Sequence, residues 1–315
     1  MYYPYFRGKQ YDLITIRENA DLLGESNFVP IIEPVKEALN GLTRTIDAVL
    51  AANGFVTLII NPQNGDHADN FASIQQLFNT ELKDKANVLA GILLTEAMTL
   101  DNIKTLSASI PSREIVFIHA GFTEGRLLGD LLKTSSDTCR HVFFEDYCGK
   151  LYRKHFSDSG MIRVLIRDGF QKRANRLHPA VEIFSDLHAT FREEGMDGFG
   201  DFLIVGDEYS ETGGPAYAVA IHLTFIDPNK DDQMYLHHFK SIRNDTPTDP
   251  AGKFAEALNE LVAEANDQNT LLFRSKAVEE FLDLHRRGHF PGLGYVKKLS
   301  MQHHIETLAN YLKNQ

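Results

Sequence analysis

The sequence predicts an α/β protein whose chain forms a (β/α)8 TIM-barrel-like domain. Short apolar runs without polar alternation recur along the chain, a pattern typical of strands buried on both faces of a parallel sheet. Amphipathic segments of helical length separate most of these runs. The repeat is roughly thirty residues long, which is the length that a βα unit requires.

Seven apolar runs carry this prediction, and each ends in a polar or turn-forming residue. They cover residues 28–32, 55–60, 88–94, 115–118, 141–144, 162–166 and 202–205, and residues 217–225 supply an eighth strand. The helices expected between them cover residues 39–51, 72–82, 100–110, 125–133 and 179–194. Further helices are expected at residues 249–266, at 275–287 and from about residue 300.

The regular pattern breaks after Asp207. Residues 208–215 are turn-forming and too few for the helix that joins two parallel strands. Residues 217–225 and 234–242 flank a turn at residues 227–230 and are typical of a β-hairpin. We therefore expect a barrel that is distorted at its seventh and eighth strands, and an open doubly wound sheet is the alternative. We expect a single domain over residues 1–315, with the barrel in 1–248 and C-terminal helices packing on it in 249–315.

Composition narrows the class of protein. The 315 residues are 43% hydrophobic and 24% charged, as in ordinary globular proteins. A net charge of −11 argues against general nucleic-acid binding. Cys139 and Cys148 form neither a zinc motif nor a disulfide framework, so we expect a reducing compartment and two buried thiols. No apolar segment approaches the ~20 residues of a membrane span, and we expect a cytoplasmic protein without membrane contact.

The candidate site follows from where the predicted strands end, because sites in parallel α/β folds form at the carboxyl ends of strands. The candidate catalytic residues there are Glu33, Glu96, His119, Glu145 and Asp207. The candidate substrate-binding residues are Arg7, Lys9, Asn61, Arg167 and Asp168. Converging carboxylates need a cation or basic partners, so Glu33, Glu96 and Glu145 are the candidate ligands of a divalent cation, Mg²⁺ or Mn²⁺.

Structural interpretations stay open beside these functional ones. Each polar strand end also fits a solvated junction, and His119 also fits a hydrogen-bonded structural histidine. The loop over residues 168–176 is the most basic stretch of an acidic chain, and it either clamps a phosphate or carboxylate or pairs with nearby acids. Glycines and cations over residues 286–304 fit a turn between helices, and no nucleotide-cofactor motif is present.

The first forty residues resemble a known family. The segments Tyr-Pro-Tyr-Phe-Arg-Gly-Lys-Gln at residues 3–10 and Val-Pro-Ile-Ile-Glu-Pro at 29–34 are similar to the opening of the beta protein family of phages and bacteria. The resemblance implies a role in conflict with phages, and it names neither a reaction nor catalytic residues.

The functional prediction is a cation-dependent hydrolase or lyase that acts on a small anionic substrate at the barrel mouth, and a phosphorylated substrate is one form of this prediction. Glu33, Glu96 and Glu145 would hold the ion or act as acid and base, and Arg167 and Lys9 would orient the anion. The alternative is a non-catalytic sensor or a partner subunit in a phage-defence or toxin-type complex. That alternative includes a protein partner encoded by a neighbouring gene, and a homo-oligomer is compatible with both hypotheses.

Overall fold

The computed structural model describes residues 1–110, 113–133, 139–157, 161–211 and 213–315. Contacts divide the chain into two compact units where the sequence analysis expected one domain. Unit 1 comprises Met1–Arg167 and Thr190–Phe202, and unit 2 comprises Asp168–Ala189 and Leu203–Gln315. None of the helices in these ranges combines the length and the apolar character that a membrane crossing requires.

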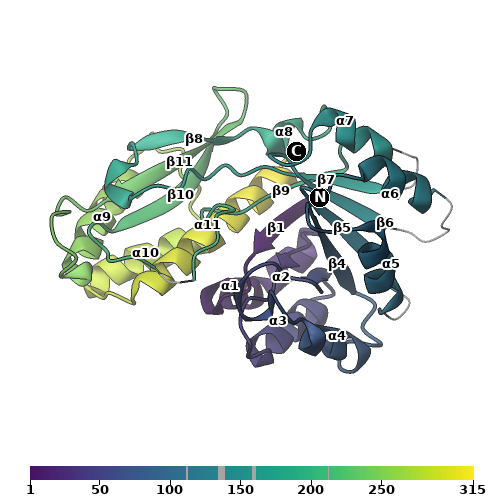
Figure 1. Cartoon of the computed structure of the whole chain (residues 1–315). Helices are drawn as coiled ribbons and strands as arrows, with labels where there is room; N and C mark the ends of the chain where they lie inside the picture. The colour runs from purple at the N-terminus through teal and green to yellow at the C-terminus, as the bar shows by residue number, and fades with distance from the viewer. Residues whose placement is uncertain (111–112, 134–138, 158–160, 212) are drawn as a thin grey trace. The chain divides into compact units, whose positions relative to one another are not determined.

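Unit 1 is a closed barrel of parallel strands, which confirms the predicted fold class (Figure 1). In spatial order the strands are β1 (Tyr2–Phe6), β2 (Ile31–Ile32), β3 (Val56–Ile59), β4 (Val88–Thr95), β5 (Ile115–Ala120), β6 (Cys139–Phe144), β7 (Ile162–Ile166) and β9 (Gly198–Asp201). Pairing of β1 with both β2 and β9 closes the barrel.

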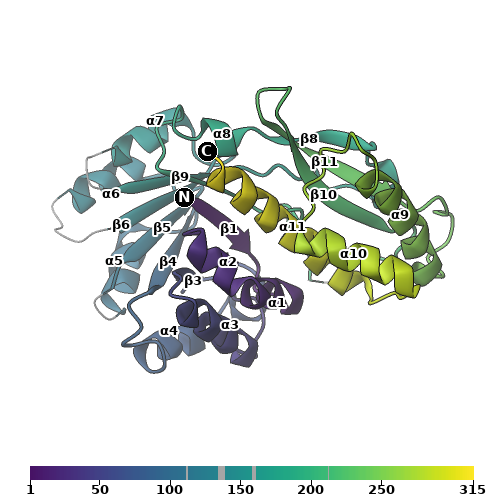
Figure 2. The same cartoon turned by 180° about the vertical axis from the view of Figure 1, so that it is seen from behind.

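Helices cover the outside of these strands in both views of the molecule (Figures 1 and 2). They are α1 (Gln10–Glu18), α2 (Ala20–Glu25), α3 (Asn40–Ala51), α4 (Ala72–Asn79), α5 (Leu100–Ala108), α6 (Gly125–Leu132) and α7 (Lys150–Arg153), with short 3₁₀ turns at Gly65–His67 and Lys154–Phe156. The predicted helices at 39–51, 72–82, 100–110 and 125–133 are confirmed to within three residues at each end.

Alternate strand residues fill the inside of the barrel. The interior cluster contains Val29 and Ile31 of the β2 segment, Ile59 of β3, Ile118 of β5 and Phe144 of β6. Successive side chains of a strand point to opposite faces. Glu33 and Asn61 therefore continue the inward-facing rows of β2 and β3, whereas His119 lies on the helix-facing side of β5.

Two barrel strands differ from the prediction. The prediction started the sheet at residue 28, but β1 precedes it, with tyrosines and a proline in place of aliphatic residues. The last strand, β9, precedes the predicted run at 202–205 and contains two glycines. A Cβ atom at Gly200 would stand 2.2 Å from the carbonyl oxygen of Tyr3, so this close strand approach requires glycine.

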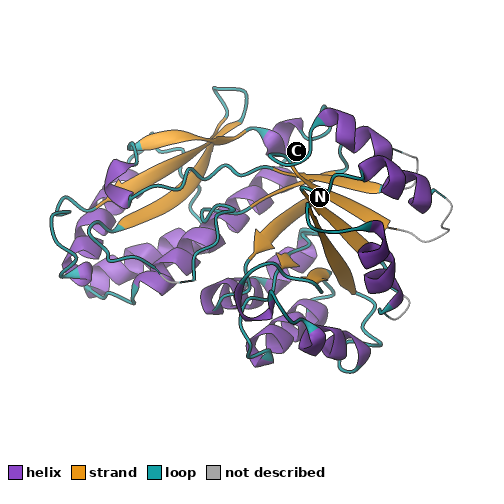
Figure 3. Ribbon diagram, viewed as in Figure 1, coloured by secondary structure: helices purple, strands orange, loops and turns teal. Residues whose placement is uncertain are grey.

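Unit 2 contains an antiparallel three-stranded sheet in the order β10 (Ala220–Asp227), β11 (Gln233–Lys240) and β8 (Val181–Ser185) (Figure 3). The predicted hairpin is confirmed as β10 and β11, so residues 217–225 do not supply the eighth barrel strand. The predicted helix over 179–194 is wrong, since this segment contains β8 and only a short helix, α8 (Leu187–Thr190). Val181 and Ile183 are β-branched, and pairing with β11 stabilises the extended form.

Three long helices complete unit 2, namely α9 (Pro250–Ala265), α10 (Lys276–Arg287) and α11 (Leu293–Lys313). Asp249 and Ser275 cap α9 and α10, because their side chains accept the backbone N–H groups of Gly252 and Val278. The helix predicted from about residue 300 begins at Leu293, directly after Gly292. Apolar side chains of β10, β11 and the three helices form one core.

Candidate metal centre and adjoining cavity

Glu33 and Arg7 lie in direct contact at the carboxyl ends of the barrel strands. Glu33 is fully buried and accepts hydrogen bonds from the Tyr5 hydroxyl at 2.9 Å and from the Arg7 guanidinium. It also accepts the backbone N–H groups of Gln63 at 2.9 Å and Asn64 at 3.1 Å. The positive charge of Arg7 thus balances the negative charge of the carboxylate, and groups of the protein supply its hydrogen bonds.

The other predicted residues near this end of the barrel have separate surroundings. The Asn61 side chain bonds to both backbone groups of Leu93, at 2.9 and 2.8 Å, and so extends the pairing of β3 with β4. Lys9 precedes α1, and its backbone N–H donates to Asp12. Glu96 follows β4 and is exposed. Within the described ranges, Glu33, Glu96 and Glu145 do not form a group whose oxygens could share one ion.

Two further pairs of predicted residues come together, one in each unit. In unit 1, Arg167 donates to both carboxylate oxygens of Glu145, at 2.5 and 3.1 Å, in a partly exposed bidentate ion pair. In unit 2, the Asp168 carboxylate accepts the backbone N–H of Asp207 at 2.7 Å and that of Phe170 at 2.9 Å. Asp168 therefore fixes the turn of its own loop.

His119 lies within a buried aromatic cluster between β5, β6 and α7. One ring nitrogen bonds to the Tyr152 hydroxyl at 2.7 Å and the other to His141 at 2.9 Å. Burial, followed by the neighbouring His141, holds the pKa of His119 well below its usual range. Cys139 and Cys148 are buried as predicted, and the Cys148 thiol donates to the His119 carbonyl oxygen at 3.2 Å. These contacts agree with the structural interpretation of His119.

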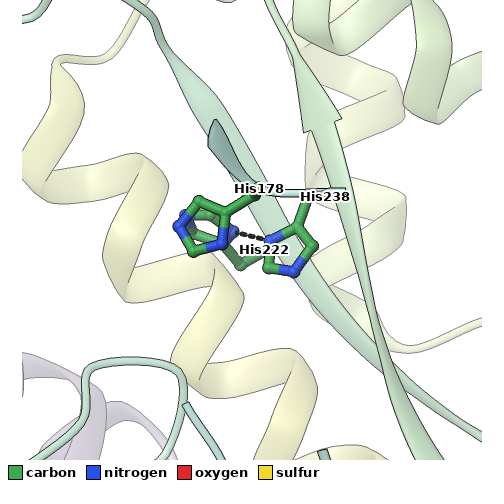
Figure 4. Close-up of side chains that lie close together, drawn as sticks. All are labelled: His178, His222 and His238. Carbon is green, nitrogen blue, oxygen red and sulfur yellow. Dashed lines mark hydrogen bonds between the residues drawn. The ribbon is translucent and has the colours of Figure 1, made fainter. Parts of the chain in front are cut away.

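A different group of side chains in unit 2 has the arrangement of a metal centre. His178, His222 and His238 each offer a ring nitrogen, and these nitrogens all lie within 4.8 Å of one another (Figure 4). It is the one group of three potential ligands in the part of the chain that the structure describes. A metal-binding site was predicted from the sequence, but these three histidines were not.

Strand pairing brings the three histidines together. His222 of β10 stands directly opposite His238 of β11, so their side chains share one face of the sheet. The backbone N–H of His238 donates to the Ala180 carbonyl oxygen, so these two residues lie opposite each other. Along the β8 segment, successive side chains then point to alternate faces of the sheet. His178, Ala180 and Glu182 consequently point to the face that carries His222 and His238.

Glu182 orients two of the three rings. Its Oε1 accepts from Nε2 of His238 at 2.8 Å and from Nδ1 of His178 at 3.3 Å. Its Oε2 accepts from Arg173 at 2.6 Å. With these protons in place, Nδ1 of His238 and Nε2 of His178 carry free lone pairs, and the buried Nε2 of His178 has no hydrogen-bond partner. A carboxylate behind ligating histidines is a common arrangement in metal sites.

The same proton positions determine which of His222 and His238 donates the hydrogen bond between them. Their Nδ1 atoms are 2.7 Å apart, and since Nδ1 of His238 is an acceptor, His222 donates. If His222 carries its proton on Nε2 instead, its Nδ1 also becomes a lone pair, and the three histidines would together hold one metal ion, as in three-histidine zinc sites.

All three histidines favour the neutral form that binds metals. Burial lowers the pKa of His178, lowers that of His238 to about 4, and holds that of His222 well below its usual range. Burial also acts to raise the pKa of Glu182. The hydrogen bond from His178 and electrostatic interactions with His238 and Arg173 outweigh it, so the pKa of Glu182 lies below its ordinary value.

A cavity of about 750 Å³ adjoins the histidine group, because His222 belongs to its wall. The wall contains four cationic side chains, those of Lys172, Arg173, Arg176 and Lys297, and no acidic residue of the described ranges. Three of these cations come from the basic loop that the sequence analysis singled out. Arg167, the residue proposed there to bind the anion, instead pairs with Glu145.

Comparisons with known proteins add no assignment. A scan against protein-family models, a search of curated proteins and a search of solved structures each found no match to this chain. The resemblance of the first forty residues to the beta protein family therefore stays a prediction.

Proposed function

We propose that this protein is a metal-dependent hydrolase whose centre is formed by His178, His222 and His238 and whose anionic substrate binds in the adjoining cavity. One observation carries the proposal: three neutral imidazoles lie together, and one of them, His222, lines a cavity that four cationic side chains also line. Three protein ligands leave a fourth position open, which is typical of catalytic rather than structural zinc sites. His222 belongs to both the metal centre and the cavity, so the open position can face the substrate.

Zinc fits this centre better than the Mg²⁺ or Mn²⁺ expected from a carboxylate site. Imidazole nitrogen is a preferred ligand of Zn²⁺, whereas Mg²⁺ and Mn²⁺ prefer oxygen ligands. Glu182 supports the assignment because it fixes which nitrogen His178 and His238 present. The residues proposed at the barrel mouth are not needed for this centre.

The chemistry follows from the charges around the cavity. Zinc held by His178, His222 and His238 would supply a hydroxide nucleophile at neutral pH, because such an ion lowers the pKa of a coordinated water to about 7. Hydrolysis would join that oxygen to the phosphorus or carbonyl carbon of the ester and break the bond to the leaving oxygen, and the leaving group would take its proton from water. Arg176 and Lys297 line the cavity, where they can stabilise negative charge on the substrate.

The competing proposal is a non-catalytic sensor or partner subunit of the kind implied by the resemblance to the beta protein family. Such a protein would bind the metal and the anion without turnover. Assays of zinc-loaded protein on phosphate monoesters and diesters and on carboxylic esters separate the two proposals.

We expect zinc-dependent hydrolysis of at least one of these ester classes. His238→Ala should abolish it, and Glu182→Gln should weaken metal affinity about 10- to 100-fold. His285→Ala is the matched control, because His285 lies exposed on α10, away from the three histidines, and bonds to Asn259. Zinc binding without turnover of any ester would favour the non-catalytic alternative.

A further inference from the structure

We propose that the cavity of unit 2 binds an organic phosphate, with Arg176 and Lys297 holding the phosphate and the apolar wall holding its organic group. This inference rests on the proposed function in one respect, since it names the substrate class of that site. The binding itself depends on the cavity and not on the metal ion.

The four cations of the cavity fall into two pairs. Lys172 donates to Glu208, at 3.0 Å to both its carbonyl and carboxylate oxygens, and Arg173 is held by Glu182 at 2.6 Å. These two cations are engaged within the protein. Each of them is therefore a weaker candidate for ligand contact.

Arg176 and Lys297 differ from that pair. In the ranges that the structure covers, neither makes a hydrogen bond or an ion pair, and no acidic side chain lines the cavity beside them. Lys297 and His222 both line this cavity. Two unneutralised cations in a concave site favour an anion with more than one negative charge.

The remainder of the wall is suited to an apolar group. Phe170, Ile204, Val205, Leu293 and Val296 line the cavity. The volume of about 750 Å³ lies within the range of small-molecule sites and far exceeds the space that a phosphate ion fills. A ligand that combines a phosphate with an apolar chain or ring uses both parts of the wall.

The first turn of α11 adds to the preference of the cavity for an anion. Leu293 and Val296 belong to this turn and line the cavity, and α11 is 21 residues long. The N-terminal end of a helix carries partial positive charge, which favours a nearby anion. Lys297 follows in the next turn, so the helix end and the lysine act on the same region.

The test uses the full chain freed of metal with EDTA, and isothermal titration with three probes: hexyl phosphate, inorganic phosphate and hexanoate. Burial of the alkyl chain should make hexyl phosphate bind about tenfold or more tightly than inorganic phosphate. The second charge should make it bind more tightly than hexanoate. Inorganic phosphate binding as tightly as hexyl phosphate would contradict the apolar subsite, and tighter binding of hexanoate would contradict the phosphate assignment.

Variants locate the site and separate it from the metal proposal. Arg176→Gln and Lys297→Gln should each weaken hexyl phosphate about tenfold with unchanged melting temperature, while Lys313→Gln, an exposed residue at the end of α11, should not. Failure of the unsubstituted chain to bind zinc, with hexyl phosphate binding retained, would contradict only the proposed function. Unchanged affinity in both cation variants would overturn this inference.

Discussion

Glu33, a residue predicted to be functional, makes the hydrogen bonds of its carboxylate with groups of the protein itself and so stabilises the fold. Its carboxylate is 0% exposed and accepts hydrogen bonds from Tyr5, Arg7, Gln63 and Asn64. Gly8 permits this contact, since its φ of +63° favours glycine and a Cβ there would stand 2.8 Å from the Glu33 carbonyl oxygen. The motifs around residues 3–10 and 29–34 are therefore joined in space by one buried ion pair.

Glu33→Gln tests this structural role. The substitution places an amide NH₂ among groups that are themselves donors and leaves Arg7 with a poorer partner. We expect the free energy of unfolding to fall by about 3–5 kcal/mol in urea titrations, because breaking a buried ion pair leaves an uncompensated charge. The zinc-induced rise in melting temperature should persist. Glu33 would instead be a metal ligand, as the sequence analysis predicted, if the substitution removed that rise.

Sequence reasoning found part of the candidate site at the residue scale. The concentration of cations over 168–176 is visible in the sequence, and Lys172, Arg173 and Arg176 line the cavity. The three histidines were missed because their partnership depends on pairing across β10, β11 and β8. His178, His222 and His238 are far apart in the chain, and an error of one residue in register turns a side chain to the opposite face.

At the scale of elements, the sequence predicts those helices and strands that are determined by the local pattern of apolar residues. Buried runs such as Val88–Thr95 and capped helices such as Lys276–Arg287 follow from apolar periodicity and end signals. The strands β1 and β9 were missed because tyrosine, proline and glycine carry no strand signal without their neighbours. The β8 segment was assigned to a helix, and its extended form depends on pairing with β11, which local periodicity cannot indicate.

At the scale of the whole molecule, buried neutral histidines recur in both units. His119 and His141 lie in unit 1, and His303 lies in unit 2, where its ring nitrogens bond to Ser275 at 2.7 Å and to the Thr224 carbonyl oxygen at 2.8 Å. Burial lowers the pKa of His141 to about 3 and that of His303 to about 4. These groups make the folded chain resist protonation.

This property predicts acid sensitivity. Below pH ~6.5 the histidines of the unfolded chain bind protons while the buried ones stay neutral, so stability falls as the pH is lowered from 6.5 toward 4. Each fully buried histidine should contribute about 1.4 kcal/mol per pH unit. Urea unfolding at pH 7.5, 6.5, 5.5 and 5.0 checks this. His141→Phe should flatten the dependence, and a free energy of unfolding that is constant over this range would contradict the account.

The central claim is that His178, His222 and His238 form a metal centre, and zinc content measures it most directly. The full chain is stripped with a chelator, incubated with excess zinc, desalted and analysed by elemental mass spectrometry together with zinc X-ray absorption. We expect about one zinc ion per chain in a shell with three imidazole ligands, lost in His178→Ala, His222→Ala and His238→Ala and retained in His285→Ala. Chains without bound zinc, or equal zinc in all four variants, would contradict it.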